Sequence, residues 1–312
     1  MSHAAITKAS QNKGGSTVTI RVYFEDGYRA VFKADQTRTA TNYRSEIVAY
    51  HLDRLLGCAR TAPVVGRRIN RAALRSLLLA SDTDADFMAR VDAELRDAPT
   101  GGAAGGATGG DAPSGDLRGA LIAWHNQPLH SLPVPRGWTK WLAAGAEAPD
   151  AMRPALPALA ELTVFDYLLD NTDRWSGGNV LLLGAGGPVI FLDNGAGFAD
   201  WRMQKQLRLD ADLAGVCEFP RGLLRNLEAM APSRPQAERL SSRLERSLRR
   251  DPLAPVLSPA HLAAIDERAG LVLAHVSACE AKRLASPEAA DSAAPTPKSS
   301  AAPQTSAEPN RR

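Results

Sequence analysis

The stretch FDYLLDNTDRWSGGNVLLLGAGGPVIFLDNGAGF, which begins at Phe165, constrains the fold of this chain more than any other. Apolar residues at helical spacing predict a buried helix over residues 156–170, and a polar loop that carries Asp173 follows it. Two apolar strands, residues 180–183 and 189–192, are joined by the turn sequence GAGG and predict a hairpin. The order helix, polar loop and hairpin therefore brings several polar groups to the same end of one compact unit.

Asp193 follows the second strand of this hairpin directly, and Asn179 precedes the first strand. An unpaired carboxylate beside an apolar strand is costly, so Asp193 requires a partner or a metal ion. In kinase-like folds, one loop acid accepts the proton of the acceptor hydroxyl, while an amide and a second acid hold metals that bridge the ATP phosphates. We therefore predict a site for ATP and Mg²⁺ or Mn²⁺, with Asp173 as the catalytic residue and Asp193 and Asn179 as metal ligands.

Three further charged residues lie close to this loop. Asp166 and Asp170 are on the predicted helix, where we expect solvated or capping acids. Arg174 follows Asp173 directly, and we expect it to hold the geometry of the loop by pairing with a carboxylate or with backbone carbonyls.

A second pattern near the N-terminus predicts a small β-rich lobe. Residues 17–24 alternate between apolar and polar, residues 28–33 return as a second strand, and Asp26-Gly27 between them favours a type I′ turn. Lys33 ends the second strand. A lysine in that position is usually solvated, but in a kinase-like fold it contacts the α- and β-phosphates of ATP and pairs with a helix glutamate.

The candidate glutamate is Glu46. We predict that Ser45 caps a helix that runs from Glu46 to Gly57. The helix dipole alone favours an acid in the first turn, so Glu46 has two interpretations, and a strand lysine thirteen residues earlier favours the ion pair. The pair Gly14-Gly15 before the first strand is predicted to bind the phosphates through backbone amides, although most such sequences are plain turns.

These patterns together predict an α+β fold of two lobes over residues 10–283 of the 312-residue chain, with a small β-rich N-lobe and a larger, mainly helical C-lobe. The N-lobe is expected over residues 10–96 and the C-lobe over residues 117–283. Residues 97–116 are rich in Gly and Ala and predict a flexible insertion. Residues 284–312 are rich in Ala, Pro and Ser and predict a disordered tail.

Charge and hydropathy exclude two classes of partner. The net charge of +3 is small and the basic residues are spread along the chain, so we expect no nucleic-acid binding. No apolar run is long enough to cross a bilayer, so we expect no stable membrane insertion. The first residues lack the apolar core of a secretory signal, and the sequence therefore predicts a cytoplasmic location. The oligomeric state stays open.

Several segments resemble the secretory-pathway atypical kinases, the group that contains four-jointed and the Golgi casein kinases. The similar segments are AVFK, SEIVAYHLDRLLGCARTAPVVGRR, TKWLAAG, FDYLLDNTDR and FLDNGAGF. The segments GVCEFPRGLLRNLEAM and AHVSACEAKRL favour the four-jointed branch.

This resemblance implies a two-lobed atypical kinase fold and an ATP-dependent protein Ser/Thr kinase that uses Mg²⁺ or Mn²⁺. It implies a disulfide between Cys217 and Cys279, and secretion is then possible. It implies contact of Lys33 with ATP phosphates and pairing of Glu46 with Lys33 or with metal. One departure concerns Asn179, which lies six residues after Asp173, whereas the kinase pattern has five.

Other functions remain open. The type II phosphatidylinositol kinases are similar in the Gly-Gly-Ser turn, the Phe-Lys strand end, the Asn-Thr-Asp-Arg loop and the Asp-Asn-Gly motif. A small-molecule kinase, with a sugar or antibiotic hydroxyl as acceptor, is another alternative. A pseudokinase that acts as a scaffold or as an activator of a partner kinase is the non-enzymatic one. The presence of Lys33, Asp173 and Asp193 favours an active kinase, and we expect a protein acceptor.

Overall fold

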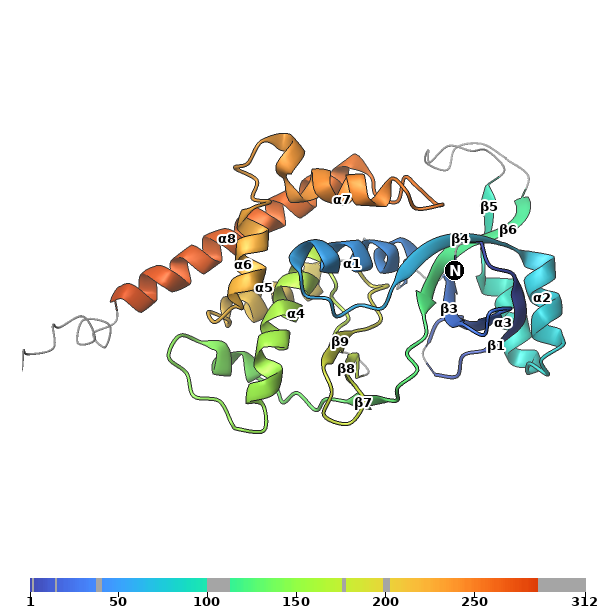
Figure 1. Cartoon of the computed structure of the whole chain (residues 1–312), viewed down its shortest axis with the longest axis horizontal. Coiled ribbons are helices and arrows are strands. Elements are labelled where there is room, and N and C mark those ends of the chain that lie inside the picture. The colour runs from blue at the N-terminus through green and yellow to red at the C-terminus, as the bar shows by residue number, and fades with distance from the viewer. Residues whose placement is uncertain are drawn as a thin grey trace, which may run out of the picture.

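The computed structural model describes residues 1, 3–14, 16–37, 41–99, 113–175, 178–198 and 203–285. Figure 1 shows two lobes, with a β-sheet and two covering helices on the right and a helical lobe on the left. The two-lobed α+β architecture predicted from the sequence is confirmed.

The N-lobe is a six-stranded antiparallel sheet in the order β1-β2-β3-β6-β4, with β5 paired to β6. Its strands are β1 (Ile6–Gln11), β2 (Ile20–Phe24), β3 (Arg29–Ala34), β4 (Val64–Asn70), β5 (Asp97–Pro99) and β6 (Pro113–Ala123). The β2–β3 hairpin with its Asp26-Gly27 turn is the one that the sequence predicts. The alternation buries Val18, Ile20, Val22 and Phe24.

The two faces of this sheet belong to different cores. One face packs on α2 (Arg71–Leu79) and α3 (Ala85–Glu94). The other face packs on α1 (Tyr43–Leu56), whose buried side chains are continuous with the core of the C-lobe. Since α1 contacts both lobes, a residue on α1 can be held at a fixed position relative to each of them.

The lobe boundaries differ from the predicted ones. The sheet begins with β1, before residue 10, and ends with β6, so the predicted C-lobe start at residue 117 lies inside an N-lobe strand. Strands β5 and β6 also include both ends of the predicted insertion at residues 97–116. Sequence periodicity missed these ends because Pro and Gly occur in them and because β6 pairs with strands far away in the sequence. Residues 100–112 lie outside the described part of the chain.

The C-lobe is built around α4, which is buried on all sides as predicted. The predicted hairpin is confirmed as β8 and β9, and β7 adds a third strand that the sequence did not indicate. The C-lobe elements are β7 (Leu129–Ser131), η1 (Trp138–Leu142), η2 (Arg153–Ala155), α4 (Leu156–Leu169), β8 (Val180–Leu183), β9 (Val189–Phe191), α5 (Met203–Ala214), α6 (Arg221–Glu228), η3 (Gln236–Glu238), α7 (Leu240–Leu248) and α8 (Pro259–Ala285).

The last helix, α8, is joined to the segment after α5 by a disulfide. Cys217 and Cys279 are bonded, with their Cα atoms 5.4 Å apart, so the implied pairing is confirmed. Helix α8 extends past residue 284, where the tail was expected to begin, and residues 286–312 lie outside the described part. Among the described helices, none combines the length and the apolar character that a bilayer span requires.

Candidate active site

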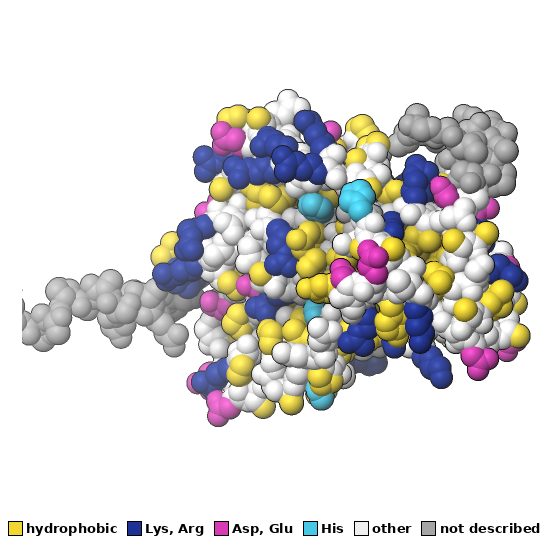
Figure 2. Space-filling model, turned by 45° about the vertical axis from the view of Figure 1, so that its right-hand side comes forward, with side chains coloured by type: hydrophobic (Ala, Val, Ile, Leu, Met, Phe, Trp, Pro, Cys, Tyr) yellow, Lys and Arg dark blue, Asp and Glu magenta, His cyan; other side chains and the backbone are white. Residues whose placement is uncertain are grey.

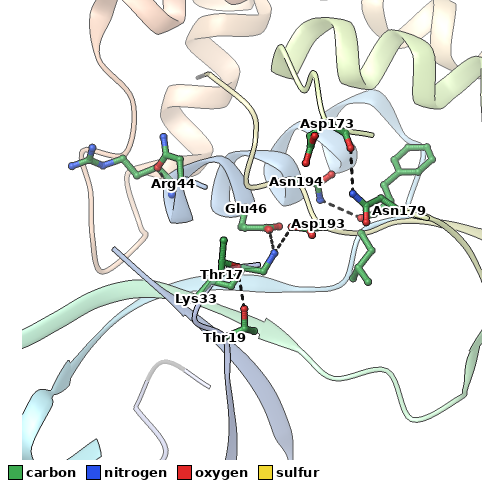
Figure 3. Close-up of polar contacts among 12 residues, drawn as sticks. Thr17, Thr19, Lys33, Arg44, Glu46, Asp173, Asn179, Asp193 and Asn194 are labelled. Carbon is green, nitrogen blue, oxygen red and sulfur yellow. Dashed lines mark hydrogen bonds and ion pairs between the residues drawn. The ribbon is translucent and has the colours of Figure 1, made fainter. Parts of the chain in front are cut away.

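Lys33 lies between two carboxylates at the junction of the lobes. Its Nζ donates to Oε1 of Glu46 and to Oδ1 of Asp193, each at 2.6 Å (Figure 3). Lys33 is 12% exposed and Glu46 only 2%, whereas Asp193 is 53% exposed. The solvated interpretation of Lys33 is therefore wrong, and the predicted ion pair with Glu46 is present.

Helix α1 places Glu46 through contacts at both of its ends. Its N-cap is Asn42, whose side chain accepts a backbone N–H of the first turn, so the predicted Ser45 cap is wrong. Ser45 lies inside the first turn, and its hydroxyl donates instead to the carbonyl of Gly197, at 2.6 Å. At the other end Gly57 takes the left-handed conformation, as predicted. The first turn is thus tied to the loop that follows Asp193.

The loop after β9 delivers Asp193 from the C-lobe to the N-lobe lysine. Asp193 has φ +56°, a left-handed conformation that costs a non-glycine residue about 1–3 kcal/mol. Among non-glycine residues, Asn and Asp adopt this conformation more often than most. The carbonyl of Gly195 accepts the N–H of Asn42 at 2.7 Å. A Cβ on Gly195 would lie 2.7 Å from Oγ1 of Thr41, so a larger residue here would require the Thr41 side chain to move.

Arg174 links the loop of the candidate catalytic acid to the hairpin. It is 1% exposed, and it forms a bidentate pair with Asp166 at 2.8 and 2.9 Å. It also donates to Oδ1 of Asn194 at 2.6 Å and to the carbonyls of Leu192 and Asn179. The expected role of Arg174 is confirmed. The expectation of a solvated or capping Asp166 is wrong, because this acid is the buried counter-charge of Arg174.

Asp170 is the C-cap residue of α4, so the capping alternative holds for it and the solvated one is wrong. It ends α4 in a left-handed conformation, is 1% exposed, and pairs with Arg268 of α8 at 2.9 Å. Arg268 also donates to the carbonyl of Leu168 at 3.1 Å. Because α4 has no solvated face, acids on it require buried cations. The sequence gives little sign of this pair, since its members are 98 residues apart.

The candidate catalytic loop brings Asp173 and Asn179 together. The side-chain amide of Asn179 donates to the carbonyl of Asp173 at 3.3 Å, and the N–H of Asp173 donates to the side chain of Asn171 at 3.3 Å. Figure 3 shows Asp173, Asn179 and Asn194 beyond Asp193, on the C-lobe side. The six-residue spacing therefore still returns Asn179 to the Asp173 loop.

The predicted glycine turn connects β1 and β2. Gly14 has φ +100°, and a Cβ there would meet nothing within 4 Å, so this part of the turn borders open space. Gly15 lies outside the described residues. The turn belongs to the same sheet as Lys33, but no described contact joins Gly14 to the other candidate site residues.

The charges keep Lys33 and Asp193 ionised. Burial by itself lowers the pKa of Lys33, but Glu46 and Asp193 outweigh it and raise that pKa above its ordinary value. The charge of Lys33 lowers the pKa of Asp193 against a smaller opposing effect of burial. Asp193 offers an ionised, half-exposed carboxylate, and Asn179 carries an amide oxygen nearby. Oxygen donors of this kind suit Mg²⁺ or Mn²⁺, so the residues fit the metal that the sequence predicts.

Comparisons with known proteins identify the family of this chain. The model of the family "Golgi casein kinase, C-terminal, Fam20" matches residues 1–77 and 147–286. Pseudokinase FAM20A of Mus musculus is 27% identical over 271 residues, which cover 76% of this chain and 47% of that protein. The extracellular serine/threonine protein kinase FAM20C of Homo sapiens is 26% identical over 329 residues, which cover 89% and 53%. The chain thus spans about half the length of these two relatives.

A third relative and two solved structures extend the comparison. The glycosaminoglycan xylosylkinase of Homo sapiens is 25% identical over 316 residues, 89% of this chain and 73% of that protein. The structure of hydra Fam20 with sugar has a TM-score of 0.66 and 24% identity, and covers 91% of this chain and 88% of its own. The Golgi casein kinase with Mn/ADP bound has a TM-score of 0.68 and 19% identity, and covers 91% and 75%. At these identities the structures establish the fold.

The relatives overturn one expectation from the sequence. The cytoplasmic location is contradicted, because the matched proteins are named as an extracellular kinase and a Golgi kinase. That expectation depended on the first residues of the chain, which say little about the compartment. The four-jointed branch stays a prediction, since the matched family model is the Fam20 one. A family model that covers more than half of the chain, together with the shared fold, shows that this chain belongs to the Fam20 family of Golgi casein kinases.

Proposed function

We propose that this chain transfers the γ-phosphoryl group of ATP to a hydroxyl group, with a protein Ser or Thr as the acceptor. The observation that carries the proposal is the position of Lys33, which bonds Glu46 and Asp193 at 2.6 Å at the junction of two lobes with a Fam20 fold. The solved Golgi casein kinase with Mn/ADP bound supports ATP and Mn²⁺ as the cofactors. FAM20C, named as a serine/threonine protein kinase, supports the acceptor class.

Each residue of the site has one task in this reaction. Lys33 binds the α- and β-phosphates, and Glu46 orients its ammonium group. Asp173 accepts the proton of the acceptor hydroxyl as the new O–P bond forms, and the γ-phosphoryl group leaves ADP. Asp193 and Asn179 hold the divalent metal, which when bound neutralises the β- and γ-phosphate oxygens. Gly14 and Gly15 cover the phosphates with backbone amides.

The family also includes a protein named as a pseudokinase, FAM20A, so membership alone does not imply catalysis. The residues of this chain support an active enzyme. Lys33, Asp173 and Asp193 are all present, and Lys33 already contacts Asp193. A scaffold or activator that does not bind nucleotide has no need for a half-buried lysine between two acids, since burying such charges is costly.

A sugar hydroxyl is the second candidate acceptor. It is favoured by the glycosaminoglycan xylosylkinase, which aligns over 89% of this chain. The lipid acceptor of the type II phosphatidylinositol kinases is a third possibility from the sequence motifs alone. A four-jointed-like preference among protein acceptors is the finer form of the main proposal.

A labelling assay with γ-³²P-ATP tests the proposal. Purified protein with Mn²⁺, and then with Mg²⁺, is offered a secreted-protein extract, xylosyl oligosaccharides and phosphatidylinositol vesicles in parallel. Asp173→Asn is the matched variant, because it removes the base and preserves the shape of the side chain. We expect label in protein bands and a loss of about 10²–10⁴-fold in the Asp173→Asn variant, which is the usual contribution of a general base.

Two results would count against this assignment. Equal labelling by Asp173→Asn would exclude Asp173 as the base. Label that occurs only in the oligosaccharide, or only in lipid, would mean that the acceptor is a sugar or a lipid and not a protein. If no acceptor is labelled, a measurement of ATP binding by the wild type tests for a scaffold that does not bind nucleotide, because a narrowly specific kinase must bind ATP.

A further inference from the structure

Helix α7 and the turn before it concentrate the positive charge of this chain. The segment from residue 234 to residue 250 contains six arginines and two glutamates, a net charge of +4, whereas the whole chain has +3. The remaining residues together are therefore slightly acidic, and the expectation of evenly spread basic residues is wrong. The six arginines are Arg234, Arg239, Arg243, Arg246, Arg249 and Arg250. Figure 2 shows a row of Lys and Arg side chains on this part of the surface, at the upper left.

Most of these arginines lack an acidic partner. In the described part of the chain, only Arg249 has a carboxylate within ion-pair distance, that of Glu245 at 3.7 Å. Arg239, Arg243 and Arg246 donate instead to backbone carbonyls of residues 234, 238 and 237, at 3.0, 2.9 and 2.8 Å. These three guanidinium groups therefore gather around η3 with no described carboxylate within ion-pair distance, and each still has unused N–H donors.

The helix that carries these arginines is anchored in the core. Leu240, Leu244 and Leu248 of α7 are buried in the core, which fixes the helix against α1 and α8. Arg243 and Arg246 lie three residues apart on one side of α7, whereas Arg239 is the N-cap of this helix and Arg250 follows its C-terminal end.

An apolar pocket lies at the C-terminal end of α7. It has a volume of about 220 Å³, and its walls come from the C-terminal turn of α7, the segment 254–257 and the start of α8. Apolar side chains form most of its lining, with Leu248, Val256 and Leu262 among them. Arg249 belongs both to the lining of the pocket and to the arginine cluster. The pocket can hold one aliphatic side chain beside this cluster of positive charges.

We propose that this surface, the arginines of residues 239–250 together with the adjacent pocket, binds an acidic peptide segment of a partner protein that carries one apolar side chain. The guanidinium groups pair with Asp, Glu or phosphorylated side chains, for which their fork geometry is suited. The apolar side chain enters the pocket and fixes the register of the peptide. Among the described residues, the hydrogen bonds and the ion pair of these arginines involve no candidate active-site residue, so docking here does not depend on phosphoryl transfer.

Other polyanions fit this surface less well. Single-stranded nucleic acid binds on aromatic platforms, and the chain contains no Phe, Trp or Tyr after Phe219. A membrane requires apolar side chains that protrude, and no large exposed apolar side chain occurs between residues 221 and 258 of the described part. A sulfated polysaccharide would use the arginines and leave the apolar pocket without a ligand.

Fluorescence anisotropy with a labelled twelve-residue peptide tests the proposal. The probe contains glutamates around one central Leu, and a second probe has Ser in place of Leu. The binding variant is Arg243→Gln/Arg246→Gln/Arg250→Gln. The matched control is Arg68→Gln/Arg75→Gln/Arg153→Gln, which removes the same charge from exposed positions elsewhere. Unchanged melting temperatures establish that both variants are folded.

We expect the binding variant to have an affinity for the Leu probe about tenfold or more below that of the wild type, and a smaller salt dependence of binding. The affinity of the control variant should stay within about twofold of the wild type. Replacement of Leu by Ser in the probe should weaken binding about tenfold in the wild type. Equal weakening in both variants would mean that net charge alone acts and would overturn the proposal. So would an unchanged affinity for the Ser probe, or binding of heparin or single-stranded DNA that the Leu probe cannot displace.

Discussion

Arg174 offers the sharpest test of how this site is held together. Arg174 makes five hydrogen bonds, two to Asp166 and three to Asn194, Leu192 and Asn179. In an Arg174→Lys variant the positive charge remains, but an ammonium group has only three donors, so at least two bonds are lost. At about 1–1.5 kcal/mol for each bond, and more for those to the carboxylate, the free energy of unfolding should fall by about 2–4 kcal/mol.

Urea denaturation measures this loss, which a domain of ordinary stability can survive. The paired variant Arg174→Met/Asp166→Leu removes both buried charges, and it should be less destabilised than the sum of the two single variants by about 2 kcal/mol or more. Binding of Mn²⁺-ADP to Arg174→Lys should weaken as well, because Arg174 holds the backbone next to Asn179 and Asp193. Two results would refute the idea that Arg174 is the centre of this network. One is a decrease of less than about 1 kcal/mol in the unfolding free energy of Arg174→Lys, and the other is a paired variant whose destabilisation equals the sum of those of the two single variants.

Three other predictions concern single features. In Lys33→Met the fold should persist while phosphoryl transfer falls by orders of magnitude, since positioning and electrostatics supply most of the rate. Unchanged kinetics would mean that the ion pairs of Lys33 are structural and that Lys33 does not bind phosphate. The pKa of Asp193 is lowered below its ordinary 3.8 and that of Lys33 is raised above 10.5, so both groups stay ionised from about pH 5 to 9. The difference in unfolding free energy between wild type and Asp193→Asn should therefore be constant over this range and should disappear only as the pH falls below 3.8, through the pKa of folded Asp193. A loss of this difference near neutral pH would contradict the prediction. The Cys217–Cys279 disulfide closes a loop with a sequence separation of 62, so the unfolding free energy of Cys217→Ser/Cys279→Ser should be about 4 kcal/mol below that of the wild type under oxidising conditions. An unchanged unfolding free energy would mean that the disulfide does not form in solution.

Local patterns in the sequence predicted most of the elements that surround the candidate active site. The β2–β3 hairpin follows from alternation and from a turn dipeptide, and both signals lie within about fifteen residues. The apolar helix α4 and the hairpin after it follow in the same way. Lys33, Glu46 and Asp193 could be placed together because each ends or begins a recognisable element.

Features that depend on distant segments were missed or misplaced. Strand β6 lies between β3 and β4 in the sheet, and only the pairing of residues across the chain identifies it as part of the N-lobe. The cap of α1 is Asn42 because the loop after Asp193 binds the backbone there, and Ser45 is then occupied with Gly197. Capping rules rank Asn and Ser about equally, so the sequence alone could not separate the two.

The acids on and after α4 show why residue type does not reveal function in this region. Asp166 and Asp170 are nearly inaccessible, and each is neutralised by a buried arginine, so both hold the structure. Asp193 is also paired, but it is half exposed and its partner is Lys33. Arginine in a bidentate pair is a fixed partner, whereas a lysine ammonium forms single bonds that phosphate oxygens can replace. In the proposed function, Lys33 exchanges its bond with Asp193 for ATP phosphates, and Asp193 is then available to a metal ion. We therefore expect the type of counter-ion to distinguish the structural acids Asp166 and Asp170 from the proposed metal ligand Asp193.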